Sequence, residues 1–316
     1  MLPTGAGARR QLCQGSNNMN ASRLRRILLD AVEHVPFYRQ HWRAAGVDLT
    51  RIPSAVHLEF LPVVRKSDLM ACPAELRIDQ RFVDRALRVE PSGTCAARSV
   101  EAVDPTSLRR RRMRLLRALM EVGYTPGERL MLVMKRPFHA GTVFLRWTCI
   151  DSGASEDEIA AAFARARPHV LYAPLNVLQR LARHMPTDVT WRPKLLVSTG
   201  APLTDAHRAL LESAFDAPVA DFYVASVVGL IAFQRPGRAA YEVLERDLHV
   251  ERVPAGPDGL ERLIVTDLCA GATPLIRYDT EDLVRRDRER PGAPIVEIRG
   301  RRANALEPAN GAWLSP

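Results

Sequence analysis

The chain has 316 residues, which is enough to bury a full hydrophobic core and to form two domains or one large domain with subdomains. Hydrophobic residues make up 47% and charged residues 26%, as is usual for soluble globular proteins. No run of the sequence approaches the roughly 18–20 apolar residues that a helix needs to cross a bilayer. We therefore expect a soluble protein without a membrane-spanning segment.

The cysteines and the N-terminus indicate the compartment. The five cysteines are scattered, odd in number and without a CxxC pair, which argues against a disulfide framework and a zinc site and favours a reducing cytoplasm. The first residues also lack the apolar stretch of a secretory signal. We expect a cytoplasmic protein in which residues 1–18 are a loose tail or an upstream extension of the true start.

The net charge of +9 comes almost entirely from arginine. The densest arginines lie in SLRRRRMRLLRALMEVG, where apolar residues recur at helical spacing. This pattern predicts an amphipathic helix over about 106–121 with its arginines in solvent. Binding of polyanions is the alternative, but aromatic interleaving and a nucleic-acid motif are both missing from the sequence, so we do not expect a nucleic-acid partner.

The segments before that helix predict three helices followed by two strands. Apolar spacing predicts a helix over 21–33, a second helix led by Pro36 and a short helix with Ser67 as its N-cap. LRVEPSGTCAARSVEAV then predicts a strand, a small-residue turn and a second strand, directly before the arginine-rich helix.

From about 128 to 224, predicted strands and helices alternate. The strands are GERLMLVMK, HVLYAP, PKLLVSTG and APVADFYV, and the helices are SEDEIAAAFARARP, NVLQRLARH and TDAHRALLESAF. Ser155 and Glu158 have the spacing of a capping box at the start of the first of these helices. This alternation predicts a parallel α/β sheet. After Gly229 the sequence is β-rich with turn signals, which predicts a β subdomain.

Three loops of small or polar residues follow predicted strands, at 198–202, 223–229 and 273–283. Ligands of open α/β sheets bind at the carboxyl ends of strands, so the three loops together indicate a binding site. The last loop, TPLIRYDTEDL, opens as a buried strand and turns polar from Arg277 to Asp282. A surface turn or a site at the end of the sheet would each explain that cluster.

The order of the motifs resembles a known family. EHVPFYRQHW, LPVVRKSDL, SGT, RPHVLYAPLNVL, LVSTGAPLT, DFYVASVVGLIAFQ, LIVTDL, TPLIRYDTEDL and IRGRRAN occur in one order over roughly residues 22–316. That order resembles the adenylate-forming (ANL) superfamily, in particular its phenylacetate–CoA ligase-like and CapK-like branch. TPLIRY with the downstream GR is the most specific part of the resemblance, and SGT alone is weak.

The resemblance implies a fold and its division. We expect an α/β protein in which an adenylate-forming N-terminal core, with parallel-sheet α/β subdomains, carries a smaller β-rich subdomain. The expected parts are a loose tail at 1–18, the α/β core at 19–229, the β-rich subdomain at 230–300 and a hinge stub at 301–316. The sequence ends at NGAWLSP, just past the hinge, so the family's C-terminal lid domain is expected to be absent.

The resemblance also implies ATP-dependent activation of a carboxylic acid. The acid attacks the α-phosphate of ATP to give an acyl-adenylate and pyrophosphate, and the thiol of CoA or another acceptor then takes the acyl group. The expected cofactors are ATP, Mg²⁺ and CoA, because in-line transfer needs charge neutralisation that Mg²⁺ on a carboxylate normally supplies. The expected partners are a nucleotide, a small-molecule carboxylic acid and a separate lid or carrier protein.

The family's nucleotide-binding residues match particular positions of this sequence. They are Ser92, Gly93 and Thr94 for the phosphate turn, Gly200, Ala201 and Pro202 for the adenine loop, Tyr223 for the base-stacking aromatic with Ser226 in the same motif, and Asp282 and Arg301 for the ribose. Each position has a structural alternative. These are a plain hairpin turn for the first group, core packing for Tyr223, a turn acid paired with Arg285 or Arg286 for Asp282, and a surface ion pair for Arg301.

The sequence departs from the family pattern in the places that handle phosphate. Val227 stands where the family has the glutamate that holds Mg²⁺, and an apolar side chain cannot ligate a hard cation. Pro91 and Ala96 replace a hydroxyl residue and a glycine in the phosphate turn, and Glu281 replaces the glycine before Asp282. With the expected absence of the lid, these changes support an alternative function, a catalytically degenerate relative that binds nucleotide or an acyl compound in regulation or assembly.

Overall fold

The computed structural model describes residues 6–54, 58–89, 101–135, 145–183, 191–225, 227–255, 259–269, 271–290 and 294–301, with the backbone alone at 6–19, 53–54, 87–89, 101 and 301. In these ranges no helix has the length and apolar character to cross a membrane. Cys72, Cys149 and Cys269 are free thiols.

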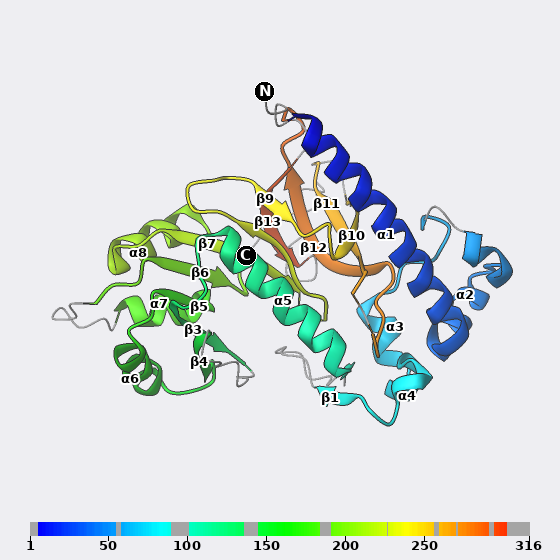
Figure 1. The fold of residues 1–316 in the computed structure, drawn as a ribbon, viewed down its shortest axis with the longest axis horizontal. Helices are drawn as coiled ribbons and strands as arrows, with labels where there is room; N and C mark the ends of the chain where they lie inside the picture. Colours follow the sequence, from blue (N-terminus) through cyan, green and yellow to red (C-terminus); the bar gives the residue numbers. More distant parts are fainter. Residues whose placement is uncertain are drawn as a thin grey trace, which may run out of the picture.

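Helices flank one long sheet (Figure 1). The helices are α1 (Ala6–His34), α2 (Pro36–Ala44), α3 (Lys66–Ala71), α4 (Ala74–Arg77), α5 (Pro105–Glu121), α6 (Glu156–Ala166), α7 (Leu175–Arg183) and α8 (Asp205–Phe215), with the short 3-10 helices η1 (Leu49–Ser54) and η2 (Gln80–Phe82). The strands are β1 (Leu87–Val89), β2 (Glu101–Val103), β3 (Arg129–Met134), β4 (Arg146–Asp151), β5 (Val170–Pro174), β6 (Leu195–Thr199), β7 (Val219–Ala225), β8 (Gly229–Gln234), β9 (Tyr241–Val243), β10 (Leu248–Pro254), β11 (Glu261–Asp267), β12 (Tyr278–Arg286) and β13 (Ile295–Arg301).

Eleven strands form a single sheet in the order β10-β11-β12-β13-β9-β8-β7-β6-β5-β3-β4. The neighbours from β4 to β7 pair parallel, as the strand–helix alternation predicts. From β7–β8 onward the pairing is antiparallel, which is how the β-rich sequence after Gly229 continues the sheet. The mixed α/β fold class is therefore confirmed.

β4 is a strand that the sequence analysis missed. It pairs with β3 alone among the described strands, and its side chains alternate between exposed and half-buried positions. Trp147 and Cys149 pack against the core on the α5 side of the sheet, while Arg146 and Thr148 are exposed. A half-buried edge strand has a weak apolar signal, and here that signal is only the alternation of Trp147 and Cys149 with polar residues.

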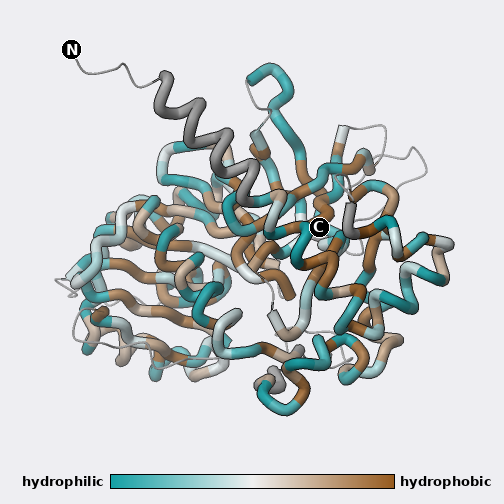
Figure 2. Tube along the Cα trace, turned by 45° about the vertical axis from the view of Figure 1, so that its right-hand side comes forward, coloured by the Kyte–Doolittle hydropathy of each residue, from teal (hydrophilic) through white to brown (hydrophobic). Residues whose placement is uncertain are grey.

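Alternate side chains of the parallel strands enter two separate cores. Met131 and Leu196 pack against α6, α7 and α8, whereas Leu132 and Val197 pack against α5 on the other face. Figure 2 shows these strands as apolar segments inside a more polar outer layer. Ser155 and Glu158 make the predicted reciprocal capping bonds at the start of α6.

A third core joins α1 and α2 to the antiparallel strands, with Leu28 and Trp42 packed in the same cluster as Val265 and Val284. Figure 1 shows α1 running along this part of the sheet. The helix starts at Ala6, upstream of the 21–33 that apolar spacing predicts. A helix fixed by its packed half can propagate upstream through a stretch that contains no proline.

α5 forms where the sequence predicts it, but its arginines do not all face solvent. Arg114 is 1% exposed and its Nη2 donates to Asp267 Oδ1 at 2.7 Å. Arg117 pairs with Asp247. The expectation of a wholly solvated arginine face is therefore wrong, because carboxylates from the distant β10–β11 region fold against the helix and helical periodicity cannot show them.

Candidate functional site

The carboxyl ends of the parallel strands form one side of the site. Gly200 directly follows β6 with φ +83°, a conformation that favours glycine, and a Cβ there would lie 3.9 Å from Pro174 Cβ at the end of β5. Thr199 Oγ1 donates to the carbonyl of Phe222 at 3.0 Å and so ties the end of β6 to β7. The predicted loop at 200–202 and Tyr223 of β7 are therefore held at the same edge of the sheet.

Tyr223 and Asp282 meet between the parallel and the antiparallel strands. The Tyr223 hydroxyl donates to Asp282 Oδ2 at 2.5 Å, and each residue is 8% exposed. Arg285 pairs with Glu297 and Arg286 with Glu261, so both arginines have carboxylate partners other than Asp282. The contact joins the aromatic and the carboxylate that the sequence analysis assigned to one nucleotide.

A bulge in β12 sets the position of Asp282. The register with β11 shifts so that Thr280, Glu281 and Asp282 lie opposite Leu263, whose carbonyl accepts the Thr280 hydroxyl at 3.1 Å. Glu281 has φ +61°, which costs a residue other than glycine roughly 1–2 kcal/mol. Its backbone N–H donates to Asp279 Oδ1 at 2.9 Å, which stabilises the bulge. A glycine at this position, as in the resembling family, would carry no such strain.

The end of β13 lies beside Asp282 and the loop at 200–202. Asp282 and Arg301 are direct cross-strand partners in the β12–β13 pair, so their backbones lie next to each other. A Cβ on Gly300 would lie 3.8 Å from Pro202 Cγ, which places this strand against the adenine loop of the sequence analysis. We call Tyr223, Asp282, the loop at 200–202 and the backbone of 300–301 the acidic side of the site.

The other polar residues of TPLIRYDTEDL hold the fold. Arg277, with φ +50°, makes a two-point ion pair with Glu251 and donates to the carbonyls of Glu59 and Leu61. Asp279 pairs with Arg262 at 2.5 Å. Arg277 and Asp279 therefore anchor the strand, and Asp282 is the carboxylate that reaches Tyr223.

The turn after β7 is apolar, and arginines bind its backbone carbonyls. Val227 packs against the core shared with α1, and its carbonyl accepts from Arg111 Nη2 at 3.2 Å. The next carbonyl, that of Val228, accepts from Arg114 Nη1 at 3.3 Å. Burial alone would lower the pKa of Arg114, but the neighbouring acidic groups, Asp267 first and then Asp247, together outweigh that effect and raise the pKa, so the guanidinium is charged. We call Val227, Val228, Arg111 and Arg114 the arginine side.

These residues do not fit a magnesium ion. Val227 offers no side-chain oxygen, and the charged groups that bind the carbonyls of Val227 and Val228 are guanidinium groups. Within the described ranges, no group of three or more His, Cys, Asp and Glu side chains is placed to hold a metal. The donor set on the arginine side therefore disagrees with the Mg²⁺ that the resemblance implies.

Asp221 is a residue near the site that the sequence analysis missed. It lies two positions before Tyr223 on β7, hence on the same face, and accepts a hydrogen bond from the Tyr241 hydroxyl at 2.5 Å. Burial raises the pKa of Asp221 to about 6, although Tyr241 and Arg208 oppose the shift. The available signal was an acid inside the apolar strand VADFYV, flanked by residues that are fully buried.

Several predicted residues lie outside the described ranges. They are Ser92, Gly93, Thr94 and Ser226, together with the side chain of Arg301. The strands that flank the phosphate turn, β1 and β2, pair antiparallel through Leu87–Val103, Arg88–Ala102 and Val89–Glu101. The structure thus brings together the adenine loop, Tyr223, Asp282 and the backbone of Arg301, and the phosphate contacts stay a prediction.

The fold belongs to a recognisable class. No family model and no curated protein matches the sequence. Solved structures do match, and those neighbours are adenylate-forming CoA ligases. The predicted adenylate-forming α/β fold is therefore confirmed.

Two particular ligases illustrate the likeness. A 2-hydroxyisobutyryl-CoA ligase, in the postadenylation state with R3-HIB-AMP, has 16% identity and a TM-score of 0.77 over 95% of this chain and 70% of its own. The same ligase with 2-HIB-AMP and CoA, in the thioesterification state, gives 18% identity and a TM-score of 0.75 over 97% and 73%. An anthranilate CoA ligase with anthranoyl-AMP has 14% identity and a TM-score of 0.56, over 76% of this chain and 50% of its own. At these identities the likeness concerns the fold, and the phenylacetate–CoA ligase branch stays a prediction.

Proposed function

We propose that this protein binds an adenine nucleotide and activates a carboxylic acid as its acyl-adenylate, in the manner of phenylacetate–CoA ligase-like enzymes. The observation that best supports the proposal is the acidic side. There Tyr223, Asp282 and the backbone of Arg301 meet beside the loop at 200–202. The 2-hydroxyisobutyryl-CoA ligase and the anthranilate CoA ligase compared above each hold an acyl-AMP in their solved structures. The proposed setting is the cytoplasm, with a separate lid or carrier protein as a partner.

Each group of the acidic side has a proposed contact. The carboxylate of Asp282 has enough lone pairs to accept from both ribose hydroxyls while it keeps the bond from Tyr223. The ring of Tyr223 offers a flat face for adenine, and the loop at 200–202 borders the base. Arg301 also reaches the ribose, Ser226 borders the base contact, and Ser92, Gly93 and Thr94 bind the phosphates through backbone N–H groups and hydroxyls.

The proposed chemistry has two balanced steps. A carboxylate oxygen of the acid forms a bond to the α-phosphorus of ATP while the bond to the bridging oxygen breaks, and pyrophosphate leaves. The sulfur of CoA or another thiol then attacks the acyl carbonyl, AMP leaves and the thiol proton is released. Neither step is assigned a metal at Val227, because that side chain cannot hold one.

Exchange of labelled pyrophosphate into ATP tests the proposal. We expect exchange with at least one acid in a panel of aryl, arylacetic and short 2-hydroxy acids, measured with and without a lid domain supplied from a related ligase. Asp282→Asn should abolish most of the exchange. If no acid in the panel supports exchange, with or without the supplied lid, the proposed activity is contradicted.

A second candidate is a nucleotide- or acyl-binding relative without turnover, acting in regulation or assembly. The specific observation in its favour is Val227, which packs in the core where a ligase of the resembling family places a metal ligand. This candidate predicts that AMP and ATP raise the unfolding temperature while no acid supports exchange. Exchange stimulated by Mg²⁺ and an acid would exclude it.

A further inference from the structure

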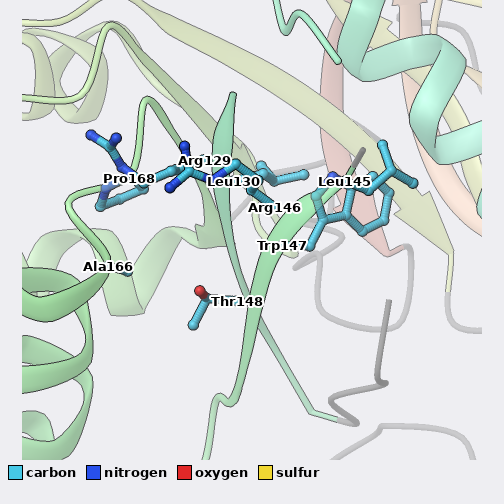
Figure 3. A pocket seen from close by; sticks show the side chains of 8 residues that line it. All are labelled: Arg129, Leu130, Leu145, Arg146, Trp147, Thr148, Ala166 and Pro168. Atoms are coloured by element: carbon cyan, nitrogen blue, oxygen red, sulfur yellow. The ribbon is translucent and has the colours of Figure 1, made fainter. Parts of the chain in front are cut away.

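A second candidate site lies at the opposite edge of the sheet. A surface pocket of about 380 Å³ is bordered by Arg129, Leu130, Leu145, Arg146, Trp147, Thr148, Ala166 and Pro168 (Figure 3). Arg129 and Arg146 are the first residues of β3 and β4, and Pro168 directly precedes the segment that enters β5. The pocket is therefore at the amino ends of the parallel strands, whereas the acidic side is at their carboxyl ends.

Two arginines stand directly beside each other in this pocket. Arg129 and Arg146 are register partners in the parallel pair of β3 and β4, so their side chains emerge on the same face of the sheet. Figure 3 shows these arginines with Thr148 on one side of β4, and Trp147 and Leu145 on the other. Like charges opposite each other on neighbouring strands are destabilising, so the pair costs free energy that a bound anion would recover.

The donors of both arginines are largely uncommitted. Arg129 Nε donates to the carbonyl of Arg167 at 2.7 Å, and its guanidinium lies 4.9 Å from the ring centre of Trp191. Within the described ranges, the Nη atoms of Arg129 and the whole guanidinium of Arg146 have no hydrogen-bond acceptor or carboxylate partner. Arg146 and Thr148 are exposed, so a ligand can approach them from solvent.

The neighbouring ionisable groups leave the two arginines as the uncompensated charges. His169 and Lys194 lie at the same edge, and the carboxylate of Glu128 is already paired with Lys194 at 2.6 Å. Burial lowers the pKa of His169 first, and the charges of Arg129, Lys194 and Arg146 lower it further against the opposing effect of Glu128, so the imidazole is neutral. Its Nδ1 accepts from the backbone N–H of Arg129 at 3.0 Å.

The carboxyl end of α6 also faces the pocket, and helix carbonyls repel anions. Two of the carbonyls there are already bonded, since Phe163 O accepts from the N–H of Arg167 at 2.9 Å and Arg167 O accepts from Arg129. The balance at this edge is therefore cationic.

We propose that this pocket binds a phosphate-class oxyanion, with Arg129 and Arg146 as paired donors and the Thr148 hydroxyl as a third. Guanidinium groups match phosphate because two parallel N–H donors meet two oxygens. A dianion also offsets two cations, which a single carboxylate does not. The pocket is larger than one phosphate, so the ligand class is a phosphate carried by a small organic group. This site is separate from the proposed nucleotide site and does not depend on its chemistry.

Calorimetric titration of the full chain with inorganic phosphate and pyrophosphate, at constant ionic strength, tests the proposal. We expect saturable binding that also changes tryptophan fluorescence, because Trp191 lies under Arg129. Arg146→Gln should weaken binding at least tenfold while phosphate-free stability stays equal or rises, since the like-charge pair is relieved. Arg25→Gln, which removes an exposed arginine of α1, is the matched control and should bind as the parent does.

Three outcomes would overturn the proposal. They are no saturable binding of either anion, equal binding by Arg146→Gln and the parent, and an equal loss in Arg25→Gln. Asp282→Asn separates the two sites, because it should leave phosphate binding at this pocket unchanged while it removes nucleotide binding at the other edge. If Asp282→Asn instead removes phosphate binding, the anion sits at the nucleotide site.

Discussion

The acidic side and the arginine side of the candidate site differ in what holds their backbone. On the acidic side a buried carboxylate meets a tyrosine hydroxyl, and the position of the carboxylate depends on a bulge in β12. On the arginine side an apolar residue faces the core, and guanidinium groups of α5 hold the turn by its carbonyls.

The two sides therefore offer different chemistry: the acidic side presents a carboxylate and a tyrosine that suit the proposed ribose and base, and the arginine side presents no side chain that suits a metal. We therefore expect nucleotide binding to depend on the acidic side, and stability to depend on the arginine side.

The largest expected effect is on the arginine side. Arg114→Leu leaves Asp267, which is 1% exposed, without its charged partner, so the free energy of unfolding should fall by about 3–5 kcal/mol. Denaturant unfolding measures this, and AMP affinity of the folded fraction should be unchanged. The double variant with Asp267→Leu should recover most of the stability. A fall below about 1 kcal/mol would mean that the pair does not anchor α5.

The second effect concerns the pH dependence of stability at Asp221, which lies near the acidic side. The pKa of Asp221 is raised to about 6 by burial, above the value of about 3.9 in an unfolded chain. The folded state therefore holds a proton on Asp221 that the unfolded chain releases. The stability that Asp221 contributes is complete below pH 4 and is lost as the pH rises through 6. The loss should be about 2–3 kcal/mol between these limits.

Asp221→Asn should remove this part of the pH dependence, as measured by unfolding at a series of pH values. Asp84→Asn, an exposed acid, is the control and should keep it. If the free energy of unfolding changes with pH equally in Asp221→Asn and the parent, Asp221 has an ordinary pKa and the account of it is wrong.

A smaller effect tests the hydrogen bond between the two key residues. Tyr223→Phe keeps the ring but removes the hydroxyl that holds Asp282, so AMP affinity should fall about fivefold, or about 1 kcal/mol. Tighter binding of AMP by this variant would mean that the hydroxyl competes with the ribose for the carboxylate.

The sequence predicted the elements that depend on neighbouring residues and missed the features that depend on tertiary contacts. The capping box of α6, the proline-led α2 and the alternation of β3 to β7 depend on neighbouring residues, and all were predicted. β4 was missed because its apolar residues are few and only partly buried. The burial of Arg114 depends on Asp267, and the position of Asp282 depends on a bulge opposite Leu263, so both required tertiary contacts.

The site divides in the same way. Tyr223 and Asp282 were recognisable by their motifs, and their meeting at 2.5 Å is visible only in three dimensions. Asp221 belongs to the same face but has no motif of its own that the sequence analysis used. The pairing of Arg129 with Arg146 needed the register of a strand that was not predicted.

The most direct test of the account is AMP binding by the parent chain and Asp282→Asn, measured by calorimetry with Asp84→Asn as control. A carboxylate that accepts from the ribose diol contributes about 1.5–3 kcal/mol, so the substitution should weaken AMP about 10- to 150-fold while Asp84→Asn binds normally. Equal affinity in the parent and Asp282→Asn, or no AMP binding by the parent, would contradict the central claim that this carboxylate holds a nucleotide.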